Sequence, residues 1–183
     1  MNKHISMNGS EEKILLEHEA ARIFMRLYEQ RYNIKMRHIW HNEPARPDVS
    51  CYYADQKLDL EIAHLYGSEV EAMHILGREL SEQTHKELLA LLRIPVAHRM
   101  LAALNRIICN KAEKRYNSER VWLVIRNANP LWRRQDMVTY CDKLHMPKQH
   151  PFEQIWVIGD MQGISGIMPL YPLELLQQEV SLC

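Results

Sequence analysis

Two acidic side chains in the first third of the chain have the spacing of a divalent-cation site. Asp48 opens a segment, residues 48–53, in which apolar and polar side chains alternate, and Glu61 lies in a second such segment, residues 58–63. A polar turn of residues 54–57 separates the two segments. This pattern predicts a β-hairpin with one apolar and one polar face. Both acids should lie on the polar face.

The apolar residues of the hairpin also predict its register. We expect residues 55–56 to form the loop, because this pairing gathers the apolar side chains of both strands on one face, and a slip of one residue would destroy the match. Asp48 and Glu61 are then diagonal neighbours, about 7–8 Å apart at the backbone. Two carboxylates at this distance can share Mg²⁺ or Mn²⁺, which prefer oxygen ligands. The expected pairs are Tyr53 with Leu58, Tyr52 with Asp59, Ser50 with Glu61, and Asp48 with Ala63.

A third carboxylate can come from the first helix, which the sequence predicts from near Ser10 to near Tyr32. Ser10 is a suitable N-cap, and acidic residues follow it in the first turn, where the helix dipole favours negative charge. Relative to the apolar face of this helix, Glu17 lies at the edge, whereas Glu19 lies well off it. We therefore expect Glu17 to point back toward the sheet and to assist the acid pair.

The order of these features resembles the PD-(D/E)XK nuclease superfamily. A helix with a glutamate is followed by a strand, and then Pro47-Asp48 opens a hairpin whose second strand carries Glu61. The resemblance covers the first 65 or so residues well and continues in topology alone to about Asn127. It implies a restriction-endonuclease-like fold. It also implies that Asp48 and Glu61 bind Mg²⁺, with Glu17 assisting, and activate the water that attacks a nucleic-acid phosphodiester.

The chain departs from this family at one position. The residue two after Glu61 should be a lysine that orients or activates the water, and it is Ala63. A lysine from elsewhere in the chain could restore the chemistry, and the sequence does not single one out. A second alignment treats Asp59 and Glu61 as an acid-x-acid variant. The expected register disfavours it, because Asp59 would lie about 13 Å along the strand from the partner of Asp48, although a bulge after Pro47 could rescue it.

The remaining elements predict an α/β protein with a single mixed β-sheet and flanking helices. Residues 1–183 should form one domain, with a restriction-endonuclease-like core at 10–127 and an extension at 128–183 that adds a C-terminal hairpin and helix. Five consecutive apolar residues, Val121–Ile125, are typical of an interior strand covered on both faces. The other expected elements are a strand at 35–40, helices at 68–92 and 96–116, a short helix after Pro130, a hairpin of 155–158 with 164–170, and a helix at 173–180.

A basic loop follows the expected interior strand. Arg126, Arg133 and Arg134 could contact phosphates, and Trp132 could stack on a base. The alternative is a capped loop that buries Trp132 in the core and leaves the arginines solvated. The sequence alone leaves both interpretations open.

Composition limits the other classes of function. The chain has 23 basic and 23 acidic residues, and a net charge of zero disfavours extended binding to duplex nucleic acid. Its ten histidines supply no cluster of four ligands at zinc-finger spacing, so we expect no zinc site. Four separated cysteines, no apolar N-terminal leader and no apolar run of about 20 residues indicate a cytoplasmic protein with no membrane partner.

Two functions remain. Asp48 and Glu61 favour a divergent nuclease that acts on nucleic acid, with weakened or lost catalysis. Ala63 favours a non-catalytic interaction protein that keeps the fold and binds a protein partner through its surface. A third interpretation assigns the acids no function beyond solvating an exposed hairpin face.

Overall fold

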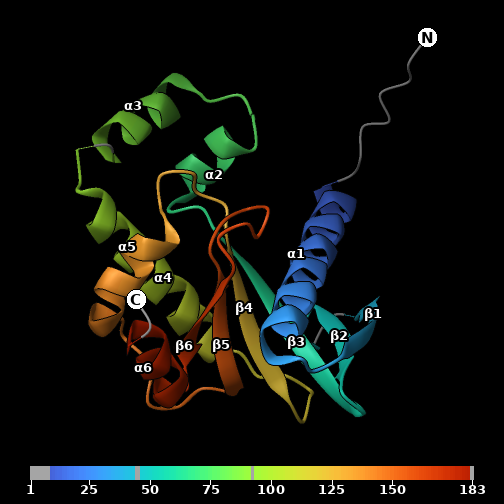
Figure 1. The fold of residues 1–183 in the computed structure, drawn as a ribbon. Helices are drawn as coiled ribbons and strands as arrows, with labels where there is room; N and C mark the ends of the chain where they lie inside the picture. Colours follow the sequence, from blue (N-terminus) through green and yellow to red (C-terminus); the bar gives the residue numbers. More distant parts are fainter. Residues whose placement is uncertain (1–8, 44–45, 92, 182–183) are drawn as a thin grey trace.

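The structure is a computed structural model that describes residues 9–43, 46–91 and 93–181 (Figure 1). The protein is α/β, as the sequence predicts, with one six-stranded mixed sheet in the order β1-β2-β3-β4-β5-β6. Strands β3 to β5 run parallel, and the flanking neighbours are antiparallel. The strands are β1 (Met36–His41), β2 (Val49–Tyr53), β3 (Gln56–Leu65), β4 (Val121–Asn127), β5 (Phe152–Ile158) and β6 (Ile167–Tyr171).

The helices cover both faces of this sheet. On one face α1 packs over an aromatic cluster, in which Phe24 and Tyr28 contact Trp122 and Trp156. The opposite face packs against α4 and α5. The helices are α1 (Gly9–Tyr32), α2 (Glu69–Ile75), α3 (Glu82–Leu91), α4 (Val96–Ala112), α5 (Arg134–Tyr140) and α6 (Leu173–Ser181), and Cys141–Lys143 form a 3₁₀ turn.

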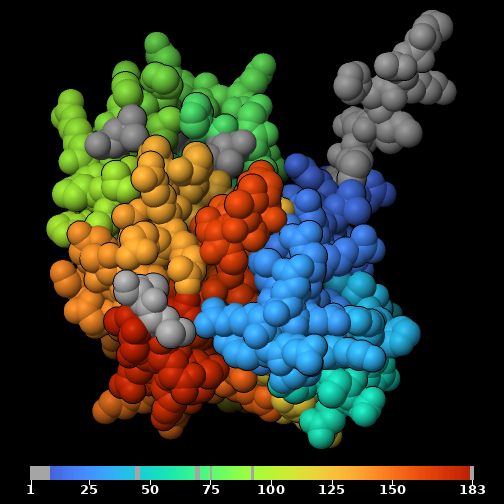
Figure 2. Space-filling model, in the orientation of Figure 1, coloured from blue at the N-terminus to red at the C-terminus, as the bar shows by residue number. Residues whose placement is uncertain are grey.

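The loop between β5 and β6 holds α1 against the sheet. Figure 2 shows the blue surface of α1 against the orange-red surface of this loop. Gly163 has a φ of +77°, and a Cβ at this position would lie 2.5 Å from Ile23 and 3.0 Å from Leu27. Only glycine combines this left-handed backbone with such a close approach to a helix. The contact fixes the position of α1, which carries Glu17.

Strand β4 confirms the prediction made from its apolar run. It lies between β3 and β5, and all seven of its residues are buried. The hairpin of β5 and β6 and the C-terminal helix are also confirmed. Alternating helices and parallel strands therefore place β4 in the interior.

Three predictions about the helices need correction. The single helix expected at 68–92 is two helices, because the chain turns after α2 and Gly77 takes a φ of +67°. The helix expected to reach Tyr116 ends at Ala112. At the N-terminus, α1 already includes Gly9, so Ser10 lies inside the helix and is not its N-cap.

The hairpin of β2 and β3 exists, but its predicted register is wrong by two residues. Ser50 pairs with Asp59 instead of Glu61. The turn is tighter than expected, because Ala54 adopts a positive φ of 50° and lets Tyr53 pair with Gln56. A shift of two keeps each side chain on its predicted face. Continued one step outward, the observed register places Asp48 directly across from Glu61.

The two acids of β3 on the polar face of this hairpin are not exposed to water. Asp59 and Glu61 are each only 2 % exposed, because α4 and the segment after it cover this face. The interpretation in which these acids solvate an open surface is therefore wrong. Buried carboxylates need partners, and their partners define the site.

Candidate active site

The candidate site lies where β3 extends beyond β2. Among the described residues, the ladder between these strands ends at Leu60, while β3 continues to Leu65 with β4 as its neighbour. The freed edge of β3 is open to groups from both faces of the sheet. Its backbone N–H at Ile62 donates to Asp48 Oδ2 at 2.9 Å, and Asp48 thus continues the edge that β2 leaves.

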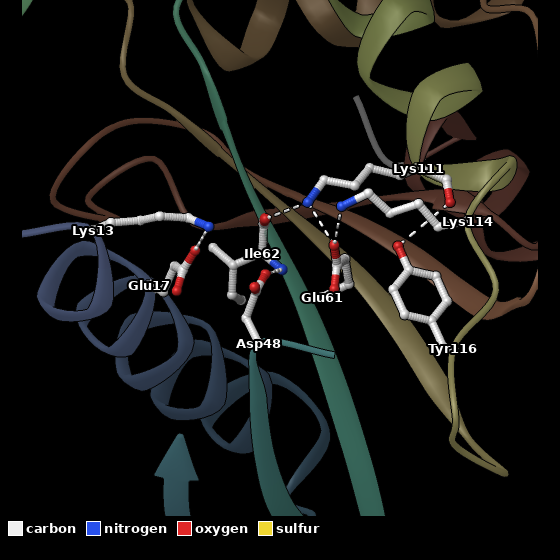
Figure 3. A network of polar contacts seen from close by, with 8 residues as sticks. All are labelled: Lys13, Glu17, Asp48, Glu61, Ile62, Lys111, Lys114 and Tyr116. Carbon is white, nitrogen blue, oxygen red and sulfur yellow. Dashed lines mark hydrogen bonds and ion pairs between the residues drawn. The ribbon is translucent and has the colours of Figure 1, made fainter. Parts of the chain in front are cut away.

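Three acidic side chains gather at this edge (Figure 3). Glu17 comes from α1, Asp48 from the start of the hairpin, and Glu61 from β3. In Figure 3, Asp48 lies between the other two. Glu17 and Glu61 are buried, at 4 % and 2 % exposure, and Asp48 is half-buried.

The acids destabilise one another in the charged form. Burial raises the pKa of Asp48, and the charge of Glu61 raises it further, against the hydrogen bond from Ile62. Burial also raises the pKa of Glu17, with a second contribution from Asp48, and Lys13 opposes both because its Nζ lies 3.4 Å from Glu17 Oε1. The site therefore concentrates negative charge that a cation would stabilise.

A lysine from α4 reaches the same point. Lys111 Nζ lies 2.6 Å from Glu61 Oε1 and donates to the carbonyl of Ile62 at 3.2 Å. Lys114 Nζ lies 3.4 Å from the same Glu61 oxygen. Ala63, the position at which the sequence resemblance implies a lysine, is 8 % exposed and packs on the same face of the sheet. Lys111 therefore brings an ammonium group to the face onto which a lysine at position 63 would project.

Sequence reasoning missed Lys111, although a signal for it exists. Met100, Leu104 and Ile108 are buried, and they recur at helical spacing on the face of α4 that meets the sheet. Lys111 follows Ile108 by three residues and continues this face. A charged residue on an otherwise apolar helix face is a candidate for a buried partner. Its partner, Glu61, is fifty residues away in sequence.

Tyr116 completes the surroundings of Glu61. Its hydroxyl lies 3.4 Å from the carbonyl of Lys111, and burial together with the nearby charge of Glu61 raises its pKa. Its ring packs on Phe152. Glu61 is thus enclosed by two ammonium groups and a phenol.

Asp59 belongs to a different network. Its Oδ1 accepts from Ser50 Oγ at 2.5 Å, and Lys57 Nζ lies 3.2 Å from it. Asn42 hydrogen-bonds to the same serine. These partners occupy Asp59 within the hairpin, which favours Asp48 and Glu61 over Asp59 and Glu61 as the acid pair.

A cleft of about 500 Å³ lies beside the acids. Glu17 and Lys111 line it, whereas Asp48 and Glu61 lie outside its lining. We expect from the sequence that the three acids converge on one concave surface, and among them only Glu17 lines this cleft. The other residues that matter for its chemistry are Lys13, His64, Tyr66 and Arg78.

The acids have the oxygen donors that Mg²⁺ or Mn²⁺ requires. Within the described part of the chain, no group of three or more His, Cys, Asp or Glu side chains lies in a geometry that could hold a metal ion. Mg²⁺ needs fewer protein ligands, because it commonly takes one or two carboxylates and completes its shell with water and substrate phosphate. Asp48 and Glu61 fit this second type of site.

The basic loop after β4 has another role. Arg126 is 2 % exposed and binds the Met161 carbonyl and Glu19, and Trp132 is also 2 % exposed. A base cannot stack on a tryptophan buried to this extent. Arg134 pairs with Glu179, and Arg133 is the exposed member of the set. Arg133 and Arg134 line a separate cleft beside Gly159–Gln162.

Comparison of the chain with models of protein families, with characterised proteins and with solved structures finds no significant match. Among the described helices, none combines the length and the apolar character needed to cross a bilayer. Function is therefore inferred from the geometry of the site.

Proposed function

We propose that the protein is a metal-dependent phosphodiester hydrolase that acts on nucleic acid. Asp48 and Glu61 are the proposed ligands of Mg²⁺ or Mn²⁺, Glu17 assists them, and Lys111 takes the place of the lysine that the resembled family carries at position 63. A bound divalent cation would lower the pKa of a water and stabilise charge on the phosphate.

The contacts of the Ile62 backbone support this proposal most directly. Its N–H donates to Asp48, and its carbonyl accepts from Lys111. Lys111 also contacts Glu61 at 2.6 Å. An acid pair and a lysine thus converge on the free edge of β3, although the lysine comes from α4.

Four residues around the acid pair would have separate roles in the reaction. Lys111 would hold the attacking water or the phosphate near Glu61, since an ammonium group stabilises the developing negative charge. Tyr116 and Lys114 would keep the Glu61 carboxylate in position. Glu17, whose pKa burial and Asp48 raise, would accept or hold a proton at the cleft.

A cleavage assay tests this proposal. Labelled single-stranded and duplex oligonucleotides are incubated with the protein in Mg²⁺, in Mn²⁺ and in EDTA. We expect slow cleavage that requires the metal, and a loss of about 10²-fold or more in Asp48→Asn and in Glu61→Gln. Asp59→Asn is the matched control, because Asp59 is an equally buried acid of the same strand. Cleavage that survives both site substitutions would place the chemistry elsewhere.

A second candidate is a non-catalytic protein that binds a protein partner. It is favoured by apolar side chains at the surface of α3 and the segment that leads into α4, where Leu89, Ile94 and Val96 are 51 %, 44 % and 41 % exposed. In this case the ion pairs of Glu61 are purely structural. The absence of cleavage with either metal, together with unchanged stability on addition of metal, would favour this candidate.

A further inference from the structure

The cleft beside the acids is lined by three cations from different parts of the chain, together with Glu12 and Glu17 of α1. Lys13 belongs to α1, Arg78 to the segment between α2 and α3, and Lys111 to α4. Lys13 is 72 % exposed, and the pair of Arg78 with Glu12 is open to solvent, at 3.8 Å with side chains 55 % and 46 % exposed. Exposed ion pairs of this kind contribute little, so these cations can turn to a phosphate.

An aromatic side chain forms part of the wall. Tyr66 follows the end of β3 and lines the cleft, and the ring of His64 stacks against it with centroids 5.9 Å apart and planes at 21°. His64 is neutral near pH 7, because burial lowers its pKa to about 4. A supported aromatic ring beside exposed cations is the combination that binds unpaired nucleotides through base stacking and phosphate contacts.

The aromatic wall of the cleft favours an unpaired strand over a duplex. The ring of Tyr66 can stack on a base only if a face of that base is free, and in a duplex both faces are covered by neighbouring bases. A volume of about 500 Å³ is typical of a pocket that encloses a small ligand.

A second polar cleft lies near Glu61. It has a volume of about 830 Å³, and Tyr116, which flanks Glu61, lines it. Its charged residues are Arg46, Lys57 and Arg120, together with Asp59 and Glu119. Glu61 contacts Lys111 of the first cleft and lies beside Tyr116 of the second, so both clefts offer cations to a bound strand near the same glutamate.

We infer that the ligand of the first cleft is an unpaired strand of nucleic acid, with a base stacked on Tyr66 and its phosphates bound by Lys13, Arg78 and Lys111. This inference rests on the proposed hydrolase function for the chemical class of the ligand. It adds that the protein selects single strands and excludes duplexes. A net charge of zero agrees with a short contact, since proteins that hold duplexes neutralise about 6–10 phosphates.

Binding of fluorescein-labelled oligonucleotides tests the inference. Fluorescence anisotropy is measured with the full-length protein in CaCl₂ and low salt, for a single strand and for the duplex of the same sequence. We expect the single strand to bind at least about tenfold more tightly than the duplex. Tyr66→Leu and Arg78→Gln should each weaken single-strand binding about fivefold or more, whereas Tyr66→Phe should not. Lys148→Gln, at an exposed lysine outside both clefts, is the control.

Equal or tighter binding of the duplex, no measurable binding of the single strand, or unchanged binding by Tyr66→Leu would overturn the inference. The proposed hydrolase function is scored separately, in the cleavage assay. Metal-dependent cleavage of a duplex at the rate of the single strand would leave the hydrolase standing and refute single-strand selection. Selective single-strand binding without any cleavage would refute the hydrolase and keep the binding site.

Discussion

At the level of single residues, the proposed active site depends on Lys111. The sequence resemblance places a lysine at position 63, where the chain has alanine, and the structure places an ammonium group from α4 on the same face. In sequence, α2, α3 and most of α4 lie between the two positions. A pattern search along β3 cannot find such a substitute, because the contact exists only after α4 packs on the sheet.

We expect Lys111→Met to lower cleavage by about 10²–10⁴-fold, since it removes a positioned charge and keeps most of the side chain's volume. Lys148→Met is the control for loss of a positive charge at the surface. Circular dichroism and a thermal melt establish that the variant is folded. Cleavage at the wild-type rate by folded Lys111→Met would show that this lysine has no part in the chemistry.

The double variant Ala63→Lys/Lys111→Met moves the lysine back to the position the family uses. Ala63 lines the cleft, so a long side chain has room there. We expect at least about tenfold more cleavage than in Lys111→Met alone, because the ammonium group again reaches the acid pair. If Asp59 and Glu61 were the true acid-x-acid pair, the added lysine would bring no gain.

The acid pair also predicts how stability depends on pH. Burial and Glu61 raise the pKa of Asp48 above its usual 3.8 in the folded state, so the folded protein holds this proton more tightly than the unfolded chain. The free energy of unfolding therefore falls as pH rises from about 4 through the raised pKa, and the loss is complete above it. We expect Asp48→Asn, which keeps an acceptor for Ile62, to be more stable than the wild type at pH 7.

Urea denaturation at pH 4 and pH 7 measures this effect. The advantage of Asp48→Asn should be larger at pH 7 than at pH 4. Asp142→Asn, at an exposed position, should show no such difference. A variant that is less stable than the wild type at pH 7 would mean that Asp48 is stabilised as a carboxylate, against the expected sign.

At the scale of elements, the site depends on α1 and α4 meeting at the free edge of β3 from opposite faces. The anchor of α1 is Phe24, which is fully buried and whose ring centroid lies 6.3 Å from that of Trp122 and 5.9 Å from that of Trp156.

We expect Phe24→Ala to lower the free energy of unfolding by about 3–5 kcal/mol. Leu15→Ala on the exposed side of the same helix should change it by less than about 0.5 kcal/mol. Urea titrations of the two variants check this, and equal effects would show that α1 is not anchored through Phe24.

Local patterns in the sequence predicted the elements better than their boundaries. The apolar run of β4 and the alternation in β2 and β3 indicate strands because burial imposes those periods. The register of the hairpin was off by two residues, since it depends on Ala54 adopting a positive φ, which alanine seldom does. The break near Gly77 was missed because the surrounding residues are good helix formers.

The residues of the candidate site were also predicted only in part. Asp48, Glu61 and Glu17 were predicted from local order, and they do lie at one edge of the sheet. Lys111 and Tyr116 were not predicted. Lys111 does continue the apolar face of α4, but nothing local identifies Glu61, fifty residues away, as its partner. Trp132 was open to two interpretations from sequence, and its burial in the structure favours the core residue.

At the level of the whole molecule, a protein with a net charge of zero holds a small, buried and strongly charged site. Its sheet keeps β1 and β2 short at the point where β3 continues, and this offset lets residues from both faces meet at Ile62. We propose that this meeting point is a divalent-cation site.

The most direct test of this claim is a crystal soaked in Mn²⁺ and measured at a wavelength where manganese scatters anomalously. If the proposed site binds the ion, we expect an anomalous peak between the carboxylates of Asp48 and Glu61, with manganese–oxygen distances of about 2.1–2.2 Å. The same soak of Asp48→Asn crystals should show no peak there. Two results would contradict the proposed cation site. One is a manganese ion bound elsewhere, and the other is well-ordered Asp48 and Glu61 side chains with no ion between them.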